Sequence, residues 1–414
     1  MNGPTMKTPV LIKASLVSIA ACIAMIFLIS DSHGQQRNSP QSKKSSPAVK
    51  QTTAAEAKKS PDKTGAAVPK DHEKKLNAEE KRKQRLEENE KKMTEWIERT
   101  LEYGIQKERL EAMNHIMKVR DEERKKNLGK LLITIIKDEI DIEVKSKAIY
   151  IAGEIKLKSA IPEISSSLND DTEDVQIAAV YALKKIRDLS ITDKMVEIMK
   201  KQDMAKDSNF TGALLDALGE FKASALKDFS LKAIKDNKTT KINREQLIIF
   251  LGKAGIKDSK EFLLKLFQDE EEDTTIRSYA VNSLAHLEAK EAGVIIDKEM
   301  RKIEKYPFKK QRNYHRLYLY GVAALARLGD ERAYPRLVNS ARSNNPSVRL
   351  QAVRLLKEIK GKRTIDILKY KMKYDPSPRV QSEAKKALKE LGVELDEDRN
   401  IQETKKLDKK TEKK

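Results

Sequence analysis

The chain has 414 residues, of which 36% are charged and 5% aromatic, and its formal net charge is +20. It contains only 15 Gly and 12 Pro, too few for the many turns of a large β protein, and it lacks alternating apolar strands between turn signals. This composition excludes a β fold. It is typical of an all-α array with long solvated faces and thin cores.

The chain opens with a segment that resembles an export signal. Lys7 and Lys13 precede an uncharged, mostly apolar run over residues 14–30. That run is long for a signal-peptide core and just short of a comfortable membrane span. We therefore expect residues 1–34 to be either a signal peptide cleaved before Gln35 or a retained single-pass membrane anchor. In both cases the body of the chain lies outside the cytoplasm, periplasmic or membrane-anchored.

The only cysteine, Cys22, lies inside this apolar run and follows Ile19, Ala20 and Ala21. These four residues resemble a bacterial lipobox, whose cysteine is lipidated after cleavage. A polar tether is expected after a lipidated cysteine, but the residues that follow Cys22 are the apolar sequence IAMIFLIS. We therefore prefer the interpretation of Cys22 as a small apolar residue. The exported body then has no disulfides, so packing alone must stabilise it.

A linker and a long helix are expected next. Residues 35–76 are rich in Pro, Ser, Thr, Ala and Lys, which predicts a disordered basic linker. The linker is either a solvated spacer or a basic tether that contacts anionic lipid headgroups or cell-wall polymers. Asn77 and Glu80 form a capping box, which predicts a long charged helix over residues 77–104 as an N-terminal cap. Trp96 is expected to pack on the first repeat, with partner binding as the alternative.

Residues 105–392 are organised by one recurring pattern. An apolar residue is followed by a small residue four positions later, Leu or Ala eight positions later and an apolar residue eleven positions later, which is one face of a helix. A second apolar stripe then begins, as at Pro162, and predicts a second helix. Such a helix pair needs stacked copies to bury both faces. The copies begin at Val144, Val175, Phe210, Ile242, Ile276, Leu317, Val348 and Val380.

Some copies depart from the pattern. The copy at Ile242 has Gln246 at the small position, so its register could be off by one residue. Successive copies begin 31 to 35 residues apart, except that the fifth and sixth are 41 apart. A longer second helix or a loop inserted around residues 305–316 would account for this step. One more degenerate helix pair is expected before Val144, and the charged residues 393–414 are expected to form a disordered tail.

These features together resemble HEAT repeats. An Asp or Asn precedes the first helix, the helix opens with Val-Lys, Ile-Arg or Val-Arg, and Ile-Pro or Tyr-Pro opens the second helix. Examples are Asp141, Asp171, Asp273, Asn345, and the pairs at 144–145, 276–277, 348–349, 161–162 and 334–335. The short period is most similar to the repeats first described in phycobilisome lyases. The resemblance implies an α-solenoid of about eight or nine HEAT-like helix pairs, a fold that serves scaffolds, adaptors, some lyases and some DNA glycosylases.

Basic residues and tyrosines concentrate near the C-terminal end of the array. Residues 301–390 contain 24 Lys and Arg against 8 Asp and Glu, and seven of the 11 tyrosines. Because cations interleaved with aromatics suit an anionic ligand, we expect this region to bind an acidic protein on a concave surface of stacked second helices. The residues expected to contact the partner are Lys309, Lys310, Arg312, Arg316, Arg349, Lys362 and Arg363.

Catalytic chemistry leaves no signature in the sequence. Gly252-Lys253 and Gly361-Lys362 lack the rest of a phosphate-binding loop, and His286 is expected to be structural. No catalytic residue, metal or cofactor is predicted. A zinc site in particular is not expected, since the body has no cysteine. We therefore expect a non-enzymatic protein-interaction scaffold or adaptor in a bacterial cell envelope. The alternatives are a nucleic-acid-binding HEAT protein and a bilin-lyase-like enzyme.

Overall fold

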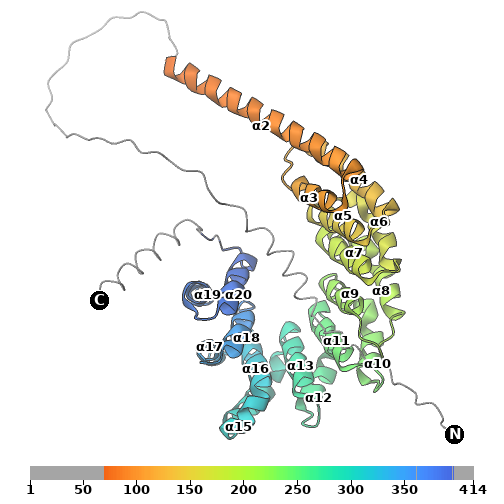
Figure 1. Ribbon diagram of the computed structural model, residues 1–414. Helices are drawn as coiled ribbons and strands as arrows, with labels where there is room; N and C mark the ends of the chain where they lie inside the picture. Colours follow the sequence, from red (N-terminus) through yellow and green to blue (C-terminus); the bar gives the residue numbers. More distant parts are fainter. Residues whose placement is uncertain (1–69, 360, 394, 396–414) are drawn as a thin grey trace, which may run out of the picture. The chain divides into compact units, whose positions relative to one another are not determined.

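The computed structural model describes residues 70–359, 361–393 and 395. The expected signal or anchor, Cys22, most of the linker and nearly all of the tail lie outside the described residues. Every regular element of the described part is an α-helix or a short 3₁₀ turn, which confirms the all-α prediction (Figure 1). Within the same part, none of the helices combines the length and the apolar character needed to cross a bilayer.

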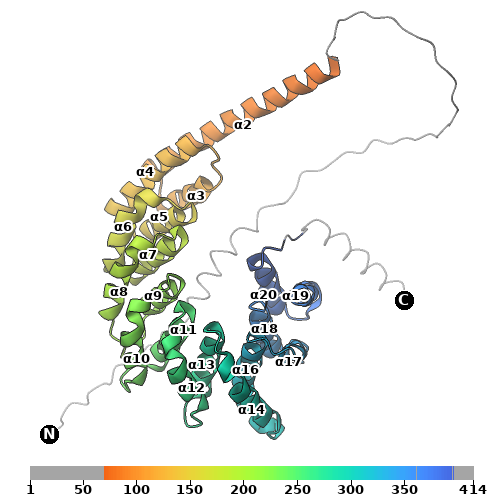
Figure 2. The same cartoon turned by 180° about the vertical axis from the view of Figure 1, so that it is seen from behind.

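Helix pairs follow one another in chain order and form an α-solenoid, as the repeat pattern predicts (Figure 1, Figure 2). The first helices of the pairs are α3 (Gln106–Ile116), α5 (Ile142–Glu154), α7 (Glu173–Ile186), α9 (Asn209–Glu220), α11 (Lys241–Ala254), α13 (Thr274–His286), α16 (His315–Arg327), α18 (Pro346–Leu356) and the final α20 (Pro378–Glu390). The second helices are α4 (Glu122–Asp138), α6 (Ile161–Ser166), α8 (Thr192–Lys200), α10 (Lys227–Lys235), α12 (Lys260–Gln268), α14 (Gly293–Glu304), α17 (Ala333–Ser340) and α19 (Lys362–Tyr374).

The repeated apolar and small residues lie in the core. Val144 and Ile276 are fully buried, as is the small residue Ala148 four positions after Val144. Burial of a Val or Ile side chain contributes about 1.5–3 kcal/mol. A Cβ atom built on Gly153 of α5 would lie 2.6 Å from the Cα of Ala182 on α7. Neighbouring first helices therefore approach so closely that only glycine fits at this point of contact.

The first helices form the closer-spaced side of the array, which we call the inner row. From α5 to α20, each first helix packs directly against the next one. From α6 onward, no two successive second helices of the described part make comparable contact. The expectation that stacked second helices form a concave surface is therefore wrong. The small residues of the pattern allow the first helices to pack closely, so the second helices are the more widely spaced elements.

The register at Ile242 is corrected by one residue. Ile242 is half exposed, whereas Asn243 is buried at the position where the other repeats have an apolar residue. The Nδ2 atom of Asn243 donates to the backbone oxygens of Met204 and Lys206, at 3.0 and 2.9 Å. These two hydrogen bonds offset the cost of burying an amide. The repeat therefore begins at Asn243.

The long N-terminal helix, α2 (Lys70–Tyr103), begins earlier than expected. Asn77 lies inside α2, so the capping box predicted there is wrong. The Oε1 atom of Glu90 accepts hydrogen bonds from the backbone N–H groups of Arg120 and Asp121, both at 2.7 Å, and so ties α2 to the turn between α3 and α4. Trp96 packs edge-on against His115 of α3, with ring centroids 5.3 Å apart, as expected of a cap on the first helix pair.

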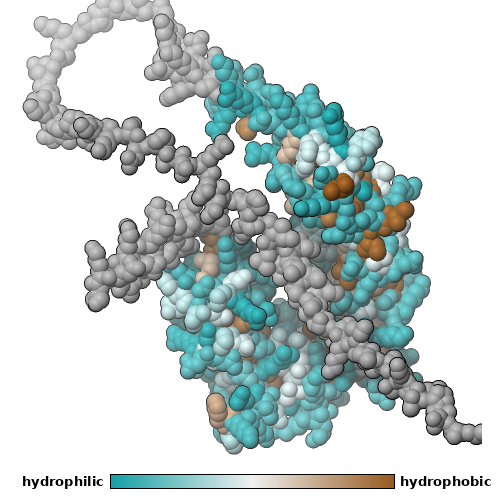
Figure 3. All heavy atoms as spheres, viewed as in Figure 1, coloured by the Kyte–Doolittle hydropathy of each residue, from teal (hydrophilic) through white to brown (hydrophobic). Residues whose placement is uncertain are grey.

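Two extra elements fill the long step between the fifth and sixth repeats. They are the short helix α15 (Phe308–Gln311) and the 3₁₀ turn η8 (Arg312–Tyr314), which lie between α14 and α16. We call residues 305–314 the insertion. Figure 3 shows apolar side chains gathered over α4 to α8 on the visible face, whereas the repeats from α13 onward are mostly hydrophilic there.

Candidate partner-binding surface

A first recurring charged position follows the opening residue of four first helices, α5, α11, α13 and α18. Arg277 of α13 is buried there, and its Nε atom donates to the backbone oxygen of Phe267 in α12 at 2.9 Å. Its Nη2 atom lies 2.9 Å from Oε1 of Glu299 in α14. The side chain thus satisfies a carbonyl at the end of one second helix and a carboxylate of the next. We call this the clip position; it pairs Lys145 with Asp170, Arg244 with Glu272 and Arg349 with Asp375.

Arg349 is therefore a structural residue, and its expected role in partner binding is wrong. Its Nε and Nη2 atoms each lie 2.9 Å from one carboxylate oxygen of Asp375, and its Nη1 atom donates to the backbone oxygens of Ser343 and Asn344. Lys371 contacts the same carboxylate at 3.1 Å. Burial raises the pKa of Asp375, but the hydrogen bonds from Arg349 and Lys371 outweigh it and lower the pKa below its ordinary value.

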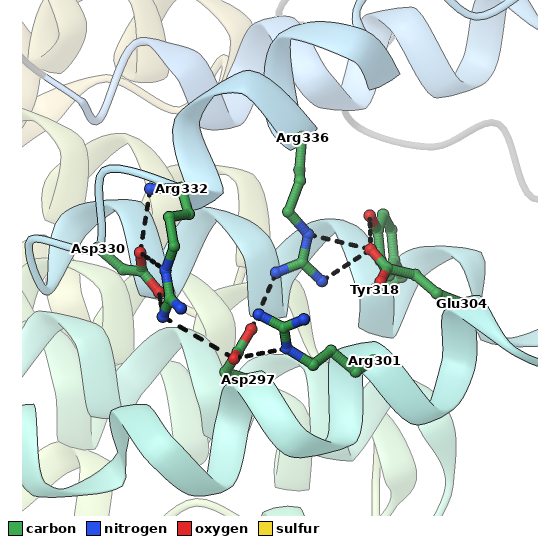
Figure 4. Close-up of polar contacts among 7 residues, drawn as sticks. All are labelled: Asp297, Arg301, Glu304, Tyr318, Asp330, Arg332 and Arg336. Carbon is green, nitrogen blue, oxygen red and sulfur yellow. Dashed lines mark hydrogen bonds and ion pairs between the residues drawn. The ribbon is translucent and has the colours of Figure 1, made fainter.

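The clip position of α16 holds Tyr318 in place of a cation, and a larger network replaces the simple pair. Figure 4 shows a network of three arginines and three carboxylates with Tyr318 at one end, where its hydroxyl donates to Oε1 of Glu304 at 2.7 Å. Arg336 of α17 joins the two halves of the network, because it bonds Glu304 at 3.0 Å and Asp297 at 3.1 Å. The remaining members are Arg301, Asp330 and Arg332. Three cations of the basic region are thereby engaged in intramolecular ion pairs.

A second recurring charged position lies ten residues after each opening residue and runs along the inner row. Its members are Glu154, Lys185, Glu220, Lys253, His286, Arg327, Glu358 and Glu390. Ion pairs connect neighbouring repeats, with Lys185 at 3.2 Å from Glu154, Lys253 at 3.2 Å from Glu220, and Arg327 at 2.6 Å from Glu358. We call this set the charge ladder. Its ion pairs involve Lys and Arg residues whose partners cannot be identified from the sequence alone.

His286 is the titratable member of the charge ladder. Its two ring nitrogens lie 3.0 and 3.1 Å from guanidinium nitrogens of Arg327. Burial, reinforced by the positive charges of Arg327, Lys222 and Lys253, lowers the pKa of His286 to about 4. The imidazole is therefore neutral at pH 7, so it adds no positive charge beside these cations.

The insertion is held in place by its own contacts. The Nε2 atom of Gln311 donates to the backbone oxygens of Glu304 and Tyr306, both at 2.9 Å. The rings of Tyr306 and Tyr314 pack edge to face with centroids 5.2 Å apart. The Nζ atom of Lys310 lies 4.1 Å from the centre of the Tyr306 ring, which is a cation–π contact. These contacts fix the insertion to the end of α14.

Three side chains of the insertion point into solvent. Phe308 is 80% exposed, and Lys309 and Arg312 are exposed as well. Neither cation forms an ion pair within the part of the chain that the structure describes, and residues 305–329 contain no Asp or Glu. Sequence reasoning did not single out Phe308. Its signal is an aromatic residue followed by two lysines inside the longest step between repeats.

Arg316 lies on the inner row rather than in the insertion. It is exposed in the first turn of α16, and its charge acts on Glu245 of α11 and on Tyr279 of α13. The rings of Tyr279 and Tyr320 lie edge to face, 5.7 Å apart. Burial raises the pKa of Tyr320 to about 12, with Arg316 acting in the opposite direction, and burial also raises the pKa of Glu245. Arg316, Tyr279 and Tyr320 thus form a cationic and aromatic site, which we call the Arg316 site.

The seven predicted contact residues therefore do not form one patch. Lys309, Lys310 and Arg312 share the insertion, and Arg316 lies on the inner row. Lys362 and Arg363 are exposed in the first turn of α19, a second helix. Charge density in the sequence located a basic region. The clip and ladder positions show which of its cations are already paired.

Comparison with known proteins supports the repeat assignment. The family model for HEAT repeats matches residues 129–207 and 316–391. The first match extends from within α4 to beyond α8, and the second extends from α16 to the end of α20. No curated protein is similar enough in sequence to be counted as a relative.

Several solved structures are similar to the chain at low sequence identity. Human deoxyhypusine hydroxylase in complex with glycerol is 16% identical over 64% of this chain and 95% of that chain, with a TM-score of 0.29. A complex of CpcE and CpcF of phycocyanin lyase from Nostoc is 15% identical over 58% and 92%, with a TM-score of 0.37. Kap121p bound to Nup53p is 12% identical over 72% and 39%, with a TM-score of 0.33.

Proposed function

We propose that this chain is a non-enzymatic interaction scaffold of the cell envelope, and that its inner row binds an acidic segment of a partner protein. The observation that carries the proposal is the Arg316 site. Arg316 is exposed and forms no ion pair within the described residues, whereas the cations of the charge ladder on the same inner row pair across the repeats. A cation left unpaired among paired ones, with Tyr279 and Tyr320 adjacent, suits a carboxylate-bearing ligand.

The mechanism is non-covalent and electrostatic. The formal net charge of +20 attracts an acidic segment over long distance, and the aligned first helices present a fixed row of side chains to it. Because exposed charges are screened over about 8 Å at physiological ionic strength, the affinity should fall as salt is added. Burial is the largest cause of the pKa shifts of His286 and Tyr320. This supports a scaffold rather than an enzyme.

The location in the envelope rests on the sequence of residues 1–34. A cleaved or retained export segment would place the array outside the cytoplasm. Fractionation of native cells, followed by the intact mass of the protein, tests this directly. Protein that begins at Gln35, or an uncut chain in the membrane fraction with its body outside, supports the proposal. Soluble protein in the cytoplasm contradicts it, and lipid on Cys22 would indicate a lipoprotein.

Site-specific photocrosslinking in native cells tests the partner site. A photoreactive amino acid replaces Tyr320 on the inner row, and a matched control replaces Tyr370, an exposed residue of α19. We expect a discrete protein adduct from position 320 that is absent from position 370. Arg316→Glu in the same chain should remove it without changing the circular dichroism spectrum. An adduct that survives Arg316→Glu, or one made to nucleic acid, would contradict the proposal.

A further inference from the structure

We propose that the insertion is a contact site for an anionic phospholipid surface, in which Phe308 enters the headgroup layer while Lys309 and Arg312 bind lipid phosphates. This goes beyond the proposed protein partner and does not depend on the Arg316 site. The site differs from the rest of the array in three respects: its geometry, its exposed aromatic ring and its uncompensated charge.

The geometry presents Phe308 outward and holds it there. α15 is a short extra helix at the edge of the array (Figure 1), and it follows shortly after the end of α14 in the chain. The hydrogen bonds of Gln311 to Glu304 and Tyr306, together with the packing of Tyr306 on Tyr314, fix the base of the insertion. These contacts hold the backbone that carries Phe308 against the end of α14. An aromatic ring that is 80% exposed on a fixed tip is an apolar group without a partner in the described residues.

Every charged residue of the insertion is a cation. Lys305, Lys309 and Arg312 are exposed, and no acidic residue occurs between residues 305 and 329. The fourth cation, Lys310, lies over the Tyr306 ring and so stays at the base of the insertion. Each Lys or Arg near an anionic membrane surface strengthens binding about fivefold. Two or three such cations together supply a strong, salt-sensitive attraction.

An anionic bilayer fits this arrangement better than an acidic peptide does. Peptides bind in grooves or along exposed strand edges, where their backbone and side chains are both enclosed. The insertion is a projecting tip, with one ring at its end and cations on its flanks. Aromatic side chains prefer the headgroup level of a bilayer, and cations beside them pair with phosphates. The tip therefore suits an anionic bilayer, which has phosphates at its surface and an apolar layer beneath them.

A fluorescent probe on the insertion tests the proposal in the full chain. Cys22→Ser removes the natural thiol, and Asn313→Cys, an exposed position of η8, carries an environment-sensitive NBD label. The labelled chain is mixed with vesicles of phosphatidylcholine alone or of phosphatidylcholine with an equal part of phosphatidylglycerol. The matched control carries the label at Ile140→Cys, which is 93% exposed but flanked by Glu139 and Asp141. The label reports only its own surroundings, so attachment through another part of the chain does not count.

We expect a blue shift and quenching by brominated lipid at position 313 with the anionic vesicles, and neither at position 140. Lys309→Glu with Arg312→Glu should raise the lipid concentration for half-maximal signal about 30-fold or more. Phe308→Ser should raise it roughly tenfold. Charge reversal at Lys362 and Arg363 should not change it. These variants alter exposed side chains, so the fold is retained.

Three results would overturn the proposal. In the first, the label at position 313 stays in water when anionic vesicles are added. In the second, positions 313 and 140 give equal signals. In the third, charge reversal at Lys362 and Arg363 weakens vesicle binding as much as charge reversal at Lys309 and Arg312. The first is also the result expected if an acidic protein is the true occupant of the insertion. Arg316→Glu separates the two proposals, because it should abolish the protein adduct and leave the vesicle signal unchanged.

Discussion

The junction between α18 and α19 and the insertion lie in the same basic stretch of sequence but use their cations in opposite ways. At the junction, Arg349 is buried and both its hydrogen-bonding edges are occupied by Asp375 and backbone oxygens. In the insertion, Lys309 and Arg312 face solvent without an ion pair in the described residues. The position of a cation within the repeat, rather than the local charge density, decides whether it stabilises the fold or is available for binding.

The largest expected difference between these two regions is in stability. Arg349→Ala would leave the buried carboxylate of Asp375 with only Lys371 and the backbone N–H of Ser377 as partners, which should lower the free energy of unfolding by about 3–4 kcal/mol. Urea unfolding followed by circular dichroism measures the change. Arg363→Ala, at an exposed position of the same basic stretch, is the control and should cost less than about 0.5 kcal/mol. Equal losses for the two variants would refute the distinction between paired and free cations.

A second test concerns the close approach of the inner row. A Cβ atom at Gly252 of α11 would lie 2.6 Å from both the Cα and the Cβ of Ser283 on α13. Gly252→Ala should therefore destabilise the fold by about 2 kcal/mol through overpacking. Gly212 of α9 has no atom within 4 Å of the same position, so Gly212→Ala should be neutral or stabilise by up to about 1 kcal/mol. Thermal unfolding of both variants would show whether the effects have opposite signs.

A third, smaller effect depends on pH and belongs to the charge ladder. The pKa of His286 is about 4 in the folded chain against 6.5 ordinarily, so the unfolded chain takes up this proton first as the pH falls. The contribution of the neutral His286 side chain to the stability of the fold is complete above pH 6.5 and is lost as the pH falls from 6.5 to 4. Because 33% of the side chain is exposed, we expect about 1–2 kcal/mol rather than the full value. Unfolding of His286→Gln should depend less on pH in this window, and an unchanged slope would contradict the assignment.

The smallest effect is expected from the insertion. Lys309→Ala with Arg312→Ala removes two exposed cations that have no ion pair in the described part, so the free energy of unfolding should change by less than about 0.5 kcal/mol. Removal of positive charge from a basic surface should leave the midpoint of thermal unfolding equal or slightly higher. A loss above 1 kcal/mol would show that these side chains are structural, and the contrast with Arg349 would fail.

The sequence was sufficient for the architecture because the repeat pattern is a packing requirement. Val144, Phe210 and Leu317 open first helices as predicted, since an apolar residue followed by small residues marks the face that packs on the next repeat. The exception at Asn243 could not be foreseen. Its amide is satisfied by the backbone oxygens of Met204 and Lys206, which lie far away in the sequence.

The binding surface was predictable only in part. The excess of Lys and Arg located the basic region, but the ion pairs of Arg349 and the network around Arg336 join residues about 26 to 39 positions apart. Such partners become evident only when the helices are stacked. The capping box predicted at Asn77 was wrong for a different reason. A capping box is a local signal, and the charged residues before Asn77 also favour a helix.

The first part of α2 has a mechanical consequence. Residues 79–89 are exposed on all sides, while Glu90 fastens the helix to the turn between α3 and α4. At about 1.5 Å of rise per residue, the stretch from Lys70 to Glu90 is a rod roughly 30 Å long. Anything joined at Lys70 is therefore kept at a set standoff from the first helix pair. A force applied at Lys70 is therefore transmitted along the rod to the first helix pair. Two adjacent glycines introduced within the rod would make it flexible at that point.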